Sequence, residues 1–187
     1  MPTWWESYSN RTVKRSSKRQ QIRRAAASDA PVIASILREA FAEYEPLYTS
    51  QGYSATTPGP DAVRDRMKEG PVWIALHGGA IVGTVSLVPE EIGFYVRGMA
   101  VLPAARGLGI GRLLLEVVES FAAANGSQRL VLSTTPFLSQ AIRLYERFGF
   151  QAASDGPRDL FGTPLLTMEK LVRARPLSNE HDRDDLP

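Results

Sequence analysis

The sequence contains no cysteine and only two histidines, His77 and His181. Disulfide bonds, thiolate metal ligands and a cysteine nucleophile are therefore excluded, and a histidine-rich metal site is excluded as well. No apolar run approaches the roughly 18 residues of a membrane-spanning helix, and the N-terminus has no apolar stretch of signal-peptide type. These absences predict a cytoplasmic protein with no metal and no membrane partner.

Acidic residues are scarce in residues 1–19, which hold five basic side chains and one acidic one, a net charge of +4. The whole chain has a net charge of +2 and residues 173–187 have −1, so residues 20–172 are nearly neutral. A neutral body disfavours nucleic-acid binding, because phosphate contacts need a clustered basic face. We predict a disordered basic arm at 1–19, one folded domain at 20–172 and a disordered tail at 173–187.

The stretch at 96–116, VRGMAVLPAARGLGIGRLLLE, predicts a strand, a tight turn and a helix. Pro103 ends the apolar strand because it has no backbone donor. Apolar residues then recur at helical spacing from about 109 to 124. Free amides of the first helical turn, the positive end of the helix dipole and absent side chains predict a phosphate or pyrophosphate site. The absent side chains belong to three alternate glycines: Gly107, Gly109 and Gly111.

The glycine spacing excludes two common phosphate-binding motifs. It departs from the G-x-G-x-x-G of dinucleotide sites, and the lysine of a P-loop is missing. What remains, Arg106-x-x-Gly109-x-Gly111, resembles the (Q/R)-x-x-G-x-(G/A) loop of the GNAT superfamily of acyl-CoA-dependent N-acyltransferases. A second stretch, from Ala141 to Phe150, resembles the family pattern A-x-x-L-Y-x-x-x-G-F. A glycine-rich turn without a ligand stays open as the alternative for the loop alone.

Periodicity and turn residues predict the element order βααβββαβαββ. The class is α/β (α+β), with a mixed, mainly antiparallel central sheet and helices on both faces. Gly78-Gly79 predicts a two-residue hairpin turn, and a right-handed crossover makes the strand at 130–132 parallel to the strand at 92–101. The segment at 42–60 is predicted as a loop near the acceptor. The GNAT resemblance covers residues 21–171 and implies that the fourth and fifth strands splay apart.

The resemblance also implies acetyl-CoA as the cofactor and assigns site residues. Tyr145 would present its hydroxyl to the thioester sulfur as an acid, since a phenol is protonated at neutral pH. Backbone amides at 99–101 would stabilise the oxyanion, and the glycine loop would hold the pyrophosphate. The cofactor-binding residues are then Met99, Ala100, Val101, Arg106, Gly107, Leu108, Gly109, Ile110, Gly111 and Arg112.

Two departures from the family pattern concern the cofactor arm and the general base. Leu138 stands where many members carry an asparagine that contacts the cofactor. Many members also place a glutamate on the fourth strand, where this chain has Phe94, Tyr95 and Val96. The base is therefore left open among three glutamates of the acceptor segment and the neighbouring turn: Glu43, Glu45 and Glu91. Tyr44 and Tyr95 are further candidates for contact with the acceptor.

These observations predict an N-acetyltransferase that moves an acetyl group from acetyl-CoA to a primary amine of a small molecule or peptide. The amine would attack the thioester directly in a ternary complex. We expect no nucleic-acid partner, and a homodimer is compatible with the sequence. Leu138 and the missing glutamate leave a catalytically weak acyl-CoA-binding sensor as the main alternative. A nucleic-acid-associated protein that uses the basic arm is the other.

Overall fold

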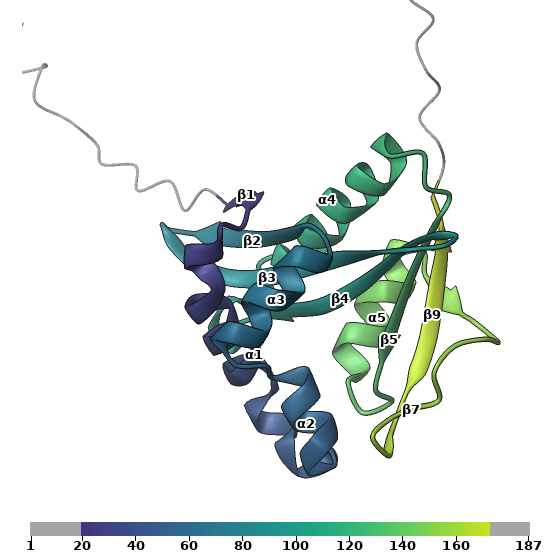
Figure 1. Cartoon of the computed structure of the whole chain (residues 1–187), viewed down its shortest axis with the longest axis horizontal. Coiled ribbons are helices and arrows are strands. Elements are labelled where there is room, and N and C mark those ends of the chain that lie inside the picture. Colours follow the sequence, from purple (N-terminus) through teal and green to yellow (C-terminus); the bar gives the residue numbers. More distant parts are fainter. Residues whose placement is uncertain (1–19, 173–187) are drawn as a thin grey trace, which may run out of the picture.

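The structure, a computed structural model, describes residues 20–172, so the predicted arm at 1–19 and tail at 173–187 lie outside the described residues. A seven-stranded sheet in the order β1-β2-β3-β4-β5-β9-β6 runs through the domain (Figure 1). Neighbouring strands are antiparallel except for the parallel β4–β5 pair. The predicted fold class is confirmed. The strands are β1 (Gln20–Arg24), β2 (Val72–His77), β3 (Ala80–Glu90), β4 (Gly93–Val101), β5 (Arg129–Thr134), β6 (Gln151–Ala152) and β9 (Leu166–Leu171).

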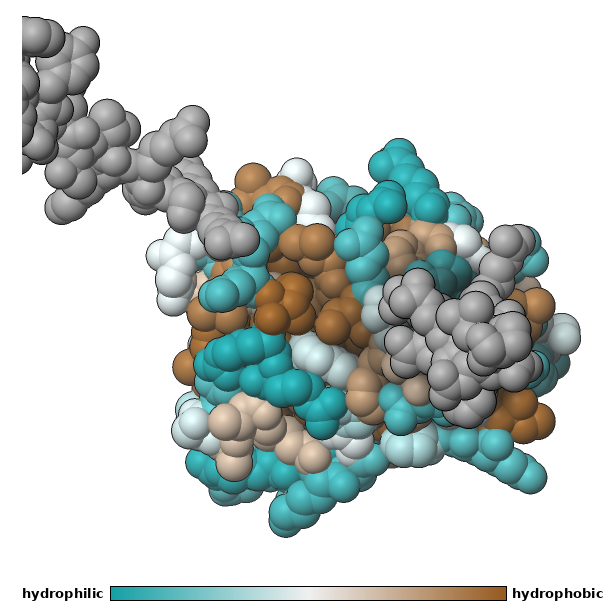
Figure 2. Space-filling view, turned by 90° about the horizontal axis from the view of Figure 1, so that it is seen from above, coloured by the Kyte–Doolittle hydropathy of each residue, from teal (hydrophilic) through white to brown (hydrophobic). Residues whose placement is uncertain are grey.

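Helices cover both faces of the sheet. The two sides are clearest at β2, where Val72 and Ile74 pack in the cluster of α1 (Ala30–Phe41) and α3 (Pro60–Glu69). Trp73 and Ala75 alternate with them and pack in the cluster of α4 (Ile110–Ala124) and α5 (Ser139–Phe148). A strand buried on both faces reads as a continuous apolar run, which β2 does. Figure 2 shows the molecule from above, and on the surface seen there apolar residues (brown) form a group among hydrophilic ones (teal).

The segment at 42–60 is not a loop, so that prediction was wrong. It forms a 3₁₀ helix, η3 (Ala42–Leu47), and a short helix, α2 (Ser50–Thr56). The hydroxyl of Thr49 accepts a hydrogen bond from the Gly52 amide (3.1 Å), which caps α2. Gly52 also fits closely against Thr163, since an added Cβ would lie 2.4 Å from Thr163 Oγ1. Contacts between distant segments therefore fix a helix whose own residues have low helix propensity.

Residue types that favour N-caps predict caps at Ser28 or Asp29, at Asp61 and at Ser139, and of these only Asp29 stands at an N-cap in the structure. Asp29 stands at the N-cap of α1, but its carboxylate bonds Arg23 and the Ala26 amide instead of the first turn of α1. Gly59, not Asp61, is the N-cap of α3. Ser139 is the first residue of α5 and does not cap it. The N-cap of α3, Gly59, has an extended backbone, and the N-cap of α5 is Leu138.

A second, two-stranded sheet escaped the prediction. It consists of β7 (Asp159–Leu160) and β8 (Thr163–Pro164), joined by Phe161 and Gly162, whose φ angles are 51° and 83°. Two successive positive φ angles are the geometry of a tight hairpin turn. The hydroxyl of Thr49 donates to the Phe161 carbonyl at 2.8 Å, so this hairpin is fastened to the start of α2.

The parallel strands β4 and β5 separate soon after they meet. Only three residue pairs connect them, Phe94 to Leu130, Tyr95 to Val131 and Val96 to Leu132, although both strands continue beyond. On the other side, the β3–β4 register shifts between Thr84 and Ser86, so Gly98 and Met99 pair with neither neighbour. The divergence is visible in Figure 1. It leaves an unpaired backbone edge in the middle of the sheet.

Candidate active site

A cavity of about 810 Å³ opens where β4 and β5 separate. Its walls come from the glycine loop and the start of α4, the second half of β4, the end of β5, and α5. The segment η3–α2 and Leu160 of the small hairpin close the other end. Nine of the ten predicted cofactor residues line this cavity, and the exposed Leu108 does not. Topology thus brings together residues that the sequence places on separate elements.

The glycine loop forms a cradle at the N-terminus of α4. Gly107 and Gly109 have φ angles of 76° and 80°, a left-handed conformation that side chains other than glycine adopt only at a cost. An added Cβ at either position would meet nothing within 4 Å, so the surface in front of the loop is open. The Leu113 amide is the first that bonds back to the Gly109 carbonyl, at 3.2 Å. The three preceding amides have no helical partner and can bind an anion.

Gly111 has a different reason to be glycine from the one its spacing suggested. Its backbone is ordinary helix, but an added Cβ would lie 2.7 Å from Leu144 Cδ2 and 3.5 Å from Met99 Cε. The missing side chain therefore lets α4 approach α5 and β4 closely. Gly111 supports the site through packing, whereas Gly107 and Gly109 shape the cradle itself.

Arg106 ties the glycine loop to the end of α1. Its Nη1 forms an ion pair with Glu43, and its Nη2 donates to the Ala40 carbonyl at 2.9 Å. Glu43, one of the predicted base candidates, is thus engaged by a cation and is not part of the cavity lining. An ion pair with this much solvent exposure contributes about 0–1 kcal/mol to stability. Its main effect is to join the cofactor loop to the acceptor segment.

Tyr145, the predicted acid, lies on α5 and lines the cavity. Its ring is 8% exposed and packs edge to face on Phe150, with the centroids 5.9 Å apart. Burial raises the pKa of Tyr145 above its usual value, and the neighbouring Tyr95 and Tyr48 raise it further. Within residues 20–172 no hydrogen bond involves its hydroxyl, and the raised pKa keeps the hydroxyl protonated at neutral pH.

Aromatic rings from the end of α1, η3 and β4 form a further part of the cavity wall, called here the aromatic wall. Tyr44 and Tyr95, both predicted acceptor contacts, line the cavity together with Phe41 and Tyr48. Sequence reasoning missed Tyr48, whose ring meets that of Phe137 edge to face at 4.9 Å. Burial raises the pKa of Tyr48. The alternation of aromatic and acidic residues at 43–48 was a signal of this wall, because a 3₁₀ helix turns successive side chains to different sides.

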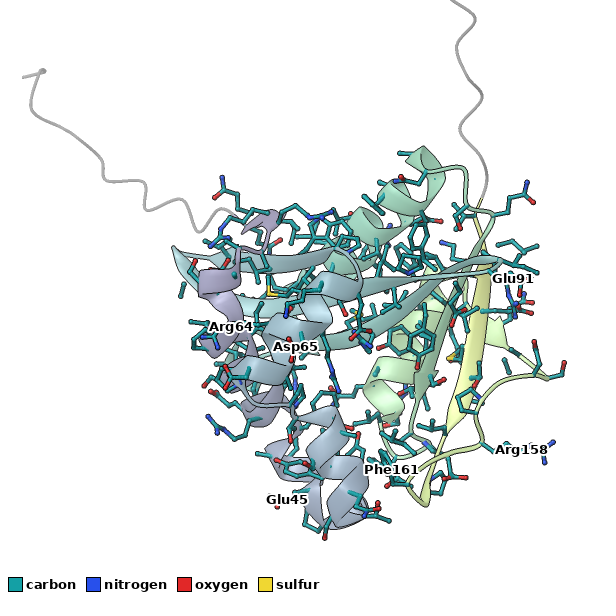
Figure 3. All side chains as sticks on the ribbon, in the orientation of Figure 1. Glu45, Arg64, Asp65, Glu91, Arg158 and Phe161 are labelled. Carbon is teal, nitrogen blue, oxygen red and sulfur yellow. The ribbon has the colours of Figure 1, made fainter. Side chains whose placement is uncertain are left out.

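No predicted base reaches the cavity. Glu45 points outward beside α2, and Glu91 lies on the β3–β4 turn at the opposite end of the molecule (Figure 3). Together with Glu43, both are absent from the lining, and no lining residue within 20–172 is Asp, Glu or His. Leu138, at the position of the missing asparagine, does line the cavity. The described lining therefore offers a donor in Tyr145 but no carboxylate or imidazole to take a proton.

The described part of the chain holds no metal-ligating cluster and no helix that could span a membrane. No group of three or more metal-ligating side chains occurs there, and none of its helices is both long and apolar enough to span a bilayer. The compartment and the homodimer stay predictions.

An anion cradle at a helix N-terminus, an unpaired strand edge and a buried tyrosine in one cavity suit a transferase with an extended, phosphorylated cofactor. Residues 33–150 match the acetyltransferase (GNAT) family, so the chain belongs to the GNAT acetyltransferases. The N-acetyltransferase YjgM of Escherichia coli (strain K12), itself uncharacterised, is 32% identical over 136 residues. That match covers 70% of this chain and 81% of YjgM.

Solved structures share the fold. A Salmonella typhimurium protein, yncA, solved with its cofactor acetyl-CoA, has a TM-score of 0.64 at 21% identity and covers 86% of this chain and 98% of its own. PaiA N-acetyltransferase of Thermoplasma acidophilum, in complex with coenzyme A, has a TM-score of 0.69 at 16% identity. It covers 82% of this chain and 99% of its own.

Proposed function

We propose that this protein is an N-acetyltransferase that transfers the acetyl group of acetyl-CoA to a primary amine. The amine, of a small molecule or peptide, attacks directly in a ternary complex. The observation that carries the proposal is one continuous cavity that links the glycine cradle, the unpaired edge of β4 and Tyr145. Acetyl-CoA and coenzyme A in two structural relatives support the choice of cofactor.

The cavity fits such a cofactor along its length. The amides of the glycine loop and the first turn of α4 would bind the pyrophosphate. Four arginines of the lining add positive charge, two from the loop and α4 and two from α5: Arg106, Arg112, Arg143 and Arg147. The free edge of β4 beyond Val96 would hold the amide-containing arm as an added strand would be held. When bound, acetyl-CoA supplies a thioester whose carbonyl carbon is electrophilic.

The chain's own groups then serve the acyl transfer. The amine lone pair would form the new C–N bond as the C–S bond breaks, coenzyme A would leave as its thiolate, and the amine proton would pass to solvent. Amides at Met99 to Val101 stabilise the negative oxygen that develops. The Tyr145 hydroxyl donates a hydrogen bond to the departing sulfur. Because the pKa of Tyr145 is raised and that of a thiol is ordinarily about 8.5, the hydroxyl supports the thiolate more than it hands over its proton.

The described lining has no carboxylate or imidazole, and this restricts the protonation state in which the acceptor amine can react. A general base would be needed to deprotonate an amine that enters as an ammonium ion. Without one, the amine enters in its neutral form, and amines of lower pKa are favoured at pH 7. The catalytically weak sensor is not favoured, since Tyr145 and the unpaired edge of β4 share one cavity.

Acetyl-CoA-dependent thiol release over a panel of amino acids, peptides, polyamines and aminoglycosides tests the proposal. Mass spectrometry of the product should show a mass gain of one acetyl group on an amine of the acceptor. Tight coenzyme A binding in calorimetry with no acetylated product from any amine would refute the proposal and favour the alternative, an acyl-CoA-binding sensor.

A further inference from the structure

All charged side chains that line the cavity, among the described residues, are positive. Its lining holds six arginines and no acidic residue. Four of these arginines come from the glycine loop, α4 and α5, and two of the four, Arg106 and Arg112, form ion pairs with glutamates outside the lining. The other two, Arg66 of α3 and Arg97 of β4, belong to the opposite side of the sheet, beside the aromatic wall. A bound cofactor's phosphates account for the first group and leave the second unexplained.

Arg66 and Arg97 are close neighbours. They share the lining of a second, small cavity with Ser86 and Gly98, and burial together with the charge of Arg97 lowers the pKa of Arg66. Two like charges in a half-buried position repel one another and lose hydration. Such an arrangement needs an anion nearby to be stable.

The protein supplies only part of that compensation. Arg97 Nη1 donates to Glu69 Oε2 at 2.7 Å, while its Nε and Nη2 are buried and make no hydrogen bond within residues 20–172. Arg66 Nη2 donates to the neutral carbonyl of Ala55 at 2.8 Å. The one carboxylate paired with either guanidinium is that of Glu69, whose side chain is 46% exposed. Two positive charges therefore share one solvated negative charge.

We propose that the acceptor carries a carboxylate and that Arg66 and Arg97 bind it, so that the substrates are amines of the amino-acid type. This inference rests on the proposed acetyl transfer. A guanidinium matches a carboxylate because its planar fork can donate two parallel hydrogen bonds. Arg97 lies two residues before Met99 on β4, at most about 7 Å along the strand. That spacing brings an amine attached close to a carboxylate toward the proposed oxyanion amides.

The aromatic wall selects the rest of the acceptor. Phe41, Tyr44, Tyr48 and Tyr95 face the same cavity, so an apolar or aromatic substituent would be buried there. Polyamines and aminoglycosides are disfavoured as acceptors. They carry several positive charges, and the described lining has no acidic side chain to pair with them.

The test uses acceptor pairs that differ only in the carboxylate: each proteinogenic amino acid beside its amide. Amidation lowers the pKa of the α-amine, so the amide offers more neutral amine at a given pH, and a preference for the acid must come from recognition. With the full-length protein and acetyl-CoA, we expect the best acid to exceed its amide at least tenfold in kcat/KM. Amides or polyamines as the best acceptors would overturn the inference and leave the acetyl transfer standing.

Variants separate recognition from folding. Arg97→Met and Arg66→Met should each reduce the acid-over-amide preference at least tenfold, chiefly through a fall in kcat/KM for the acid, with coenzyme A affinity within threefold of wild type. Glu69→Gln is the matched control, because it removes the partner of Arg97 but not the guanidinium. It should keep or increase the preference. The inference fails if Glu69→Gln loses the preference as Arg97→Met does, or if Arg97→Met lowers coenzyme A affinity tenfold.

A binding measurement distinguishes the two proposals. In thermal-shift assays with coenzyme A present, amino acids should raise the melting temperature of wild type more than their amides, and Arg97→Met should abolish the difference. If this binding is seen but nothing is acetylated, the proposed function fails and the carboxylate site remains. Equal shifts for acids and amides would refute the carboxylate site, whatever the turnover.

Discussion

Replacing Tyr145 with phenylalanine removes one hydroxyl and keeps the ring in place. The ring packs on Phe150, and the hydroxyl has no partner within residues 20–172. Its loss leaves no protein group unsatisfied, so the free energy of unfolding should change by less than about 0.5 kcal/mol. A hydrogen bond to a charged atom contributes about 1.5–3 kcal/mol, which corresponds to a tenfold to hundredfold fall in kcat.

Steady-state kinetics with the best acceptor, together with calorimetry for coenzyme A, would measure this effect. The affinity for coenzyme A should change less than threefold, because the hydroxyl acts on the sulfur only as the C–S bond breaks. Tyr53→Phe is a matched control, since Tyr53 lies outside the cavity lining. If Tyr145→Phe keeps kcat within threefold of wild type, Tyr145 is a packing residue and water supplies the proton.

Three further predictions concern the cradle, an N-terminal ion pair and the acceptor. Gly109→Val should weaken coenzyme A binding at least tenfold in calorimetry, whereas Gly111→Val should chiefly lower the melting temperature by displacing Leu144; unchanged affinity in the first would contradict the cradle. The Arg23 guanidinium lowers the pKa of Asp29, so this stabilisation exists above the ordinary value of about 3.9 and is lost as pH falls through the lower folded value. Asp29→Asn should therefore cost about 1 kcal/mol at pH 7 in denaturant melts, with the difference from wild type vanishing in acid. Finally, kcat/KM should rise with pH up to the pKa of the acceptor amine and shift when the acceptor is changed; a break at one fixed pH for every acceptor would reveal a base on the protein.

The sequence predicted those elements that carry an apolar period or a turn signal. Helix α4, the hairpin at Gly78-Gly79 and the parallel β4–β5 pair all follow from such local patterns. Helix α2 does not, because its Gly, Ser and Thr residues have low propensity, and its N-cap Thr49 is held by Thr163, which is distant in the sequence. Local patterns cannot report contacts of that kind.

The site divides in the same way. The cradle and Tyr145 belong to motifs with fixed spacing, so their positions could be named in advance. The direction of a glutamate side chain on a 3₁₀ helix could not be predicted from the sequence. In the structure, Glu43 forms an ion pair with Arg106. The pairing of Arg66 with Arg97 joins a helix to a strand without any fixed spacing. The only signal was an arginine within the apolar strand β4, a charge that must find a partner.

The sheet is built as two blocks with a narrow seam. Strands β1 to β4 form one block, and β5, β9 and β6 form the other, with six residue pairs between β5 and β9 but three across the seam. Cohesion between the blocks therefore depends on side-chain packing, including that of Leu114, Leu132 and Phe150 in the shared apolar cluster. Amide hydrogen exchange should resolve the blocks as separate cooperative units. A molecule bound along the seam would supply the missing backbone partners and slow exchange in both blocks at once.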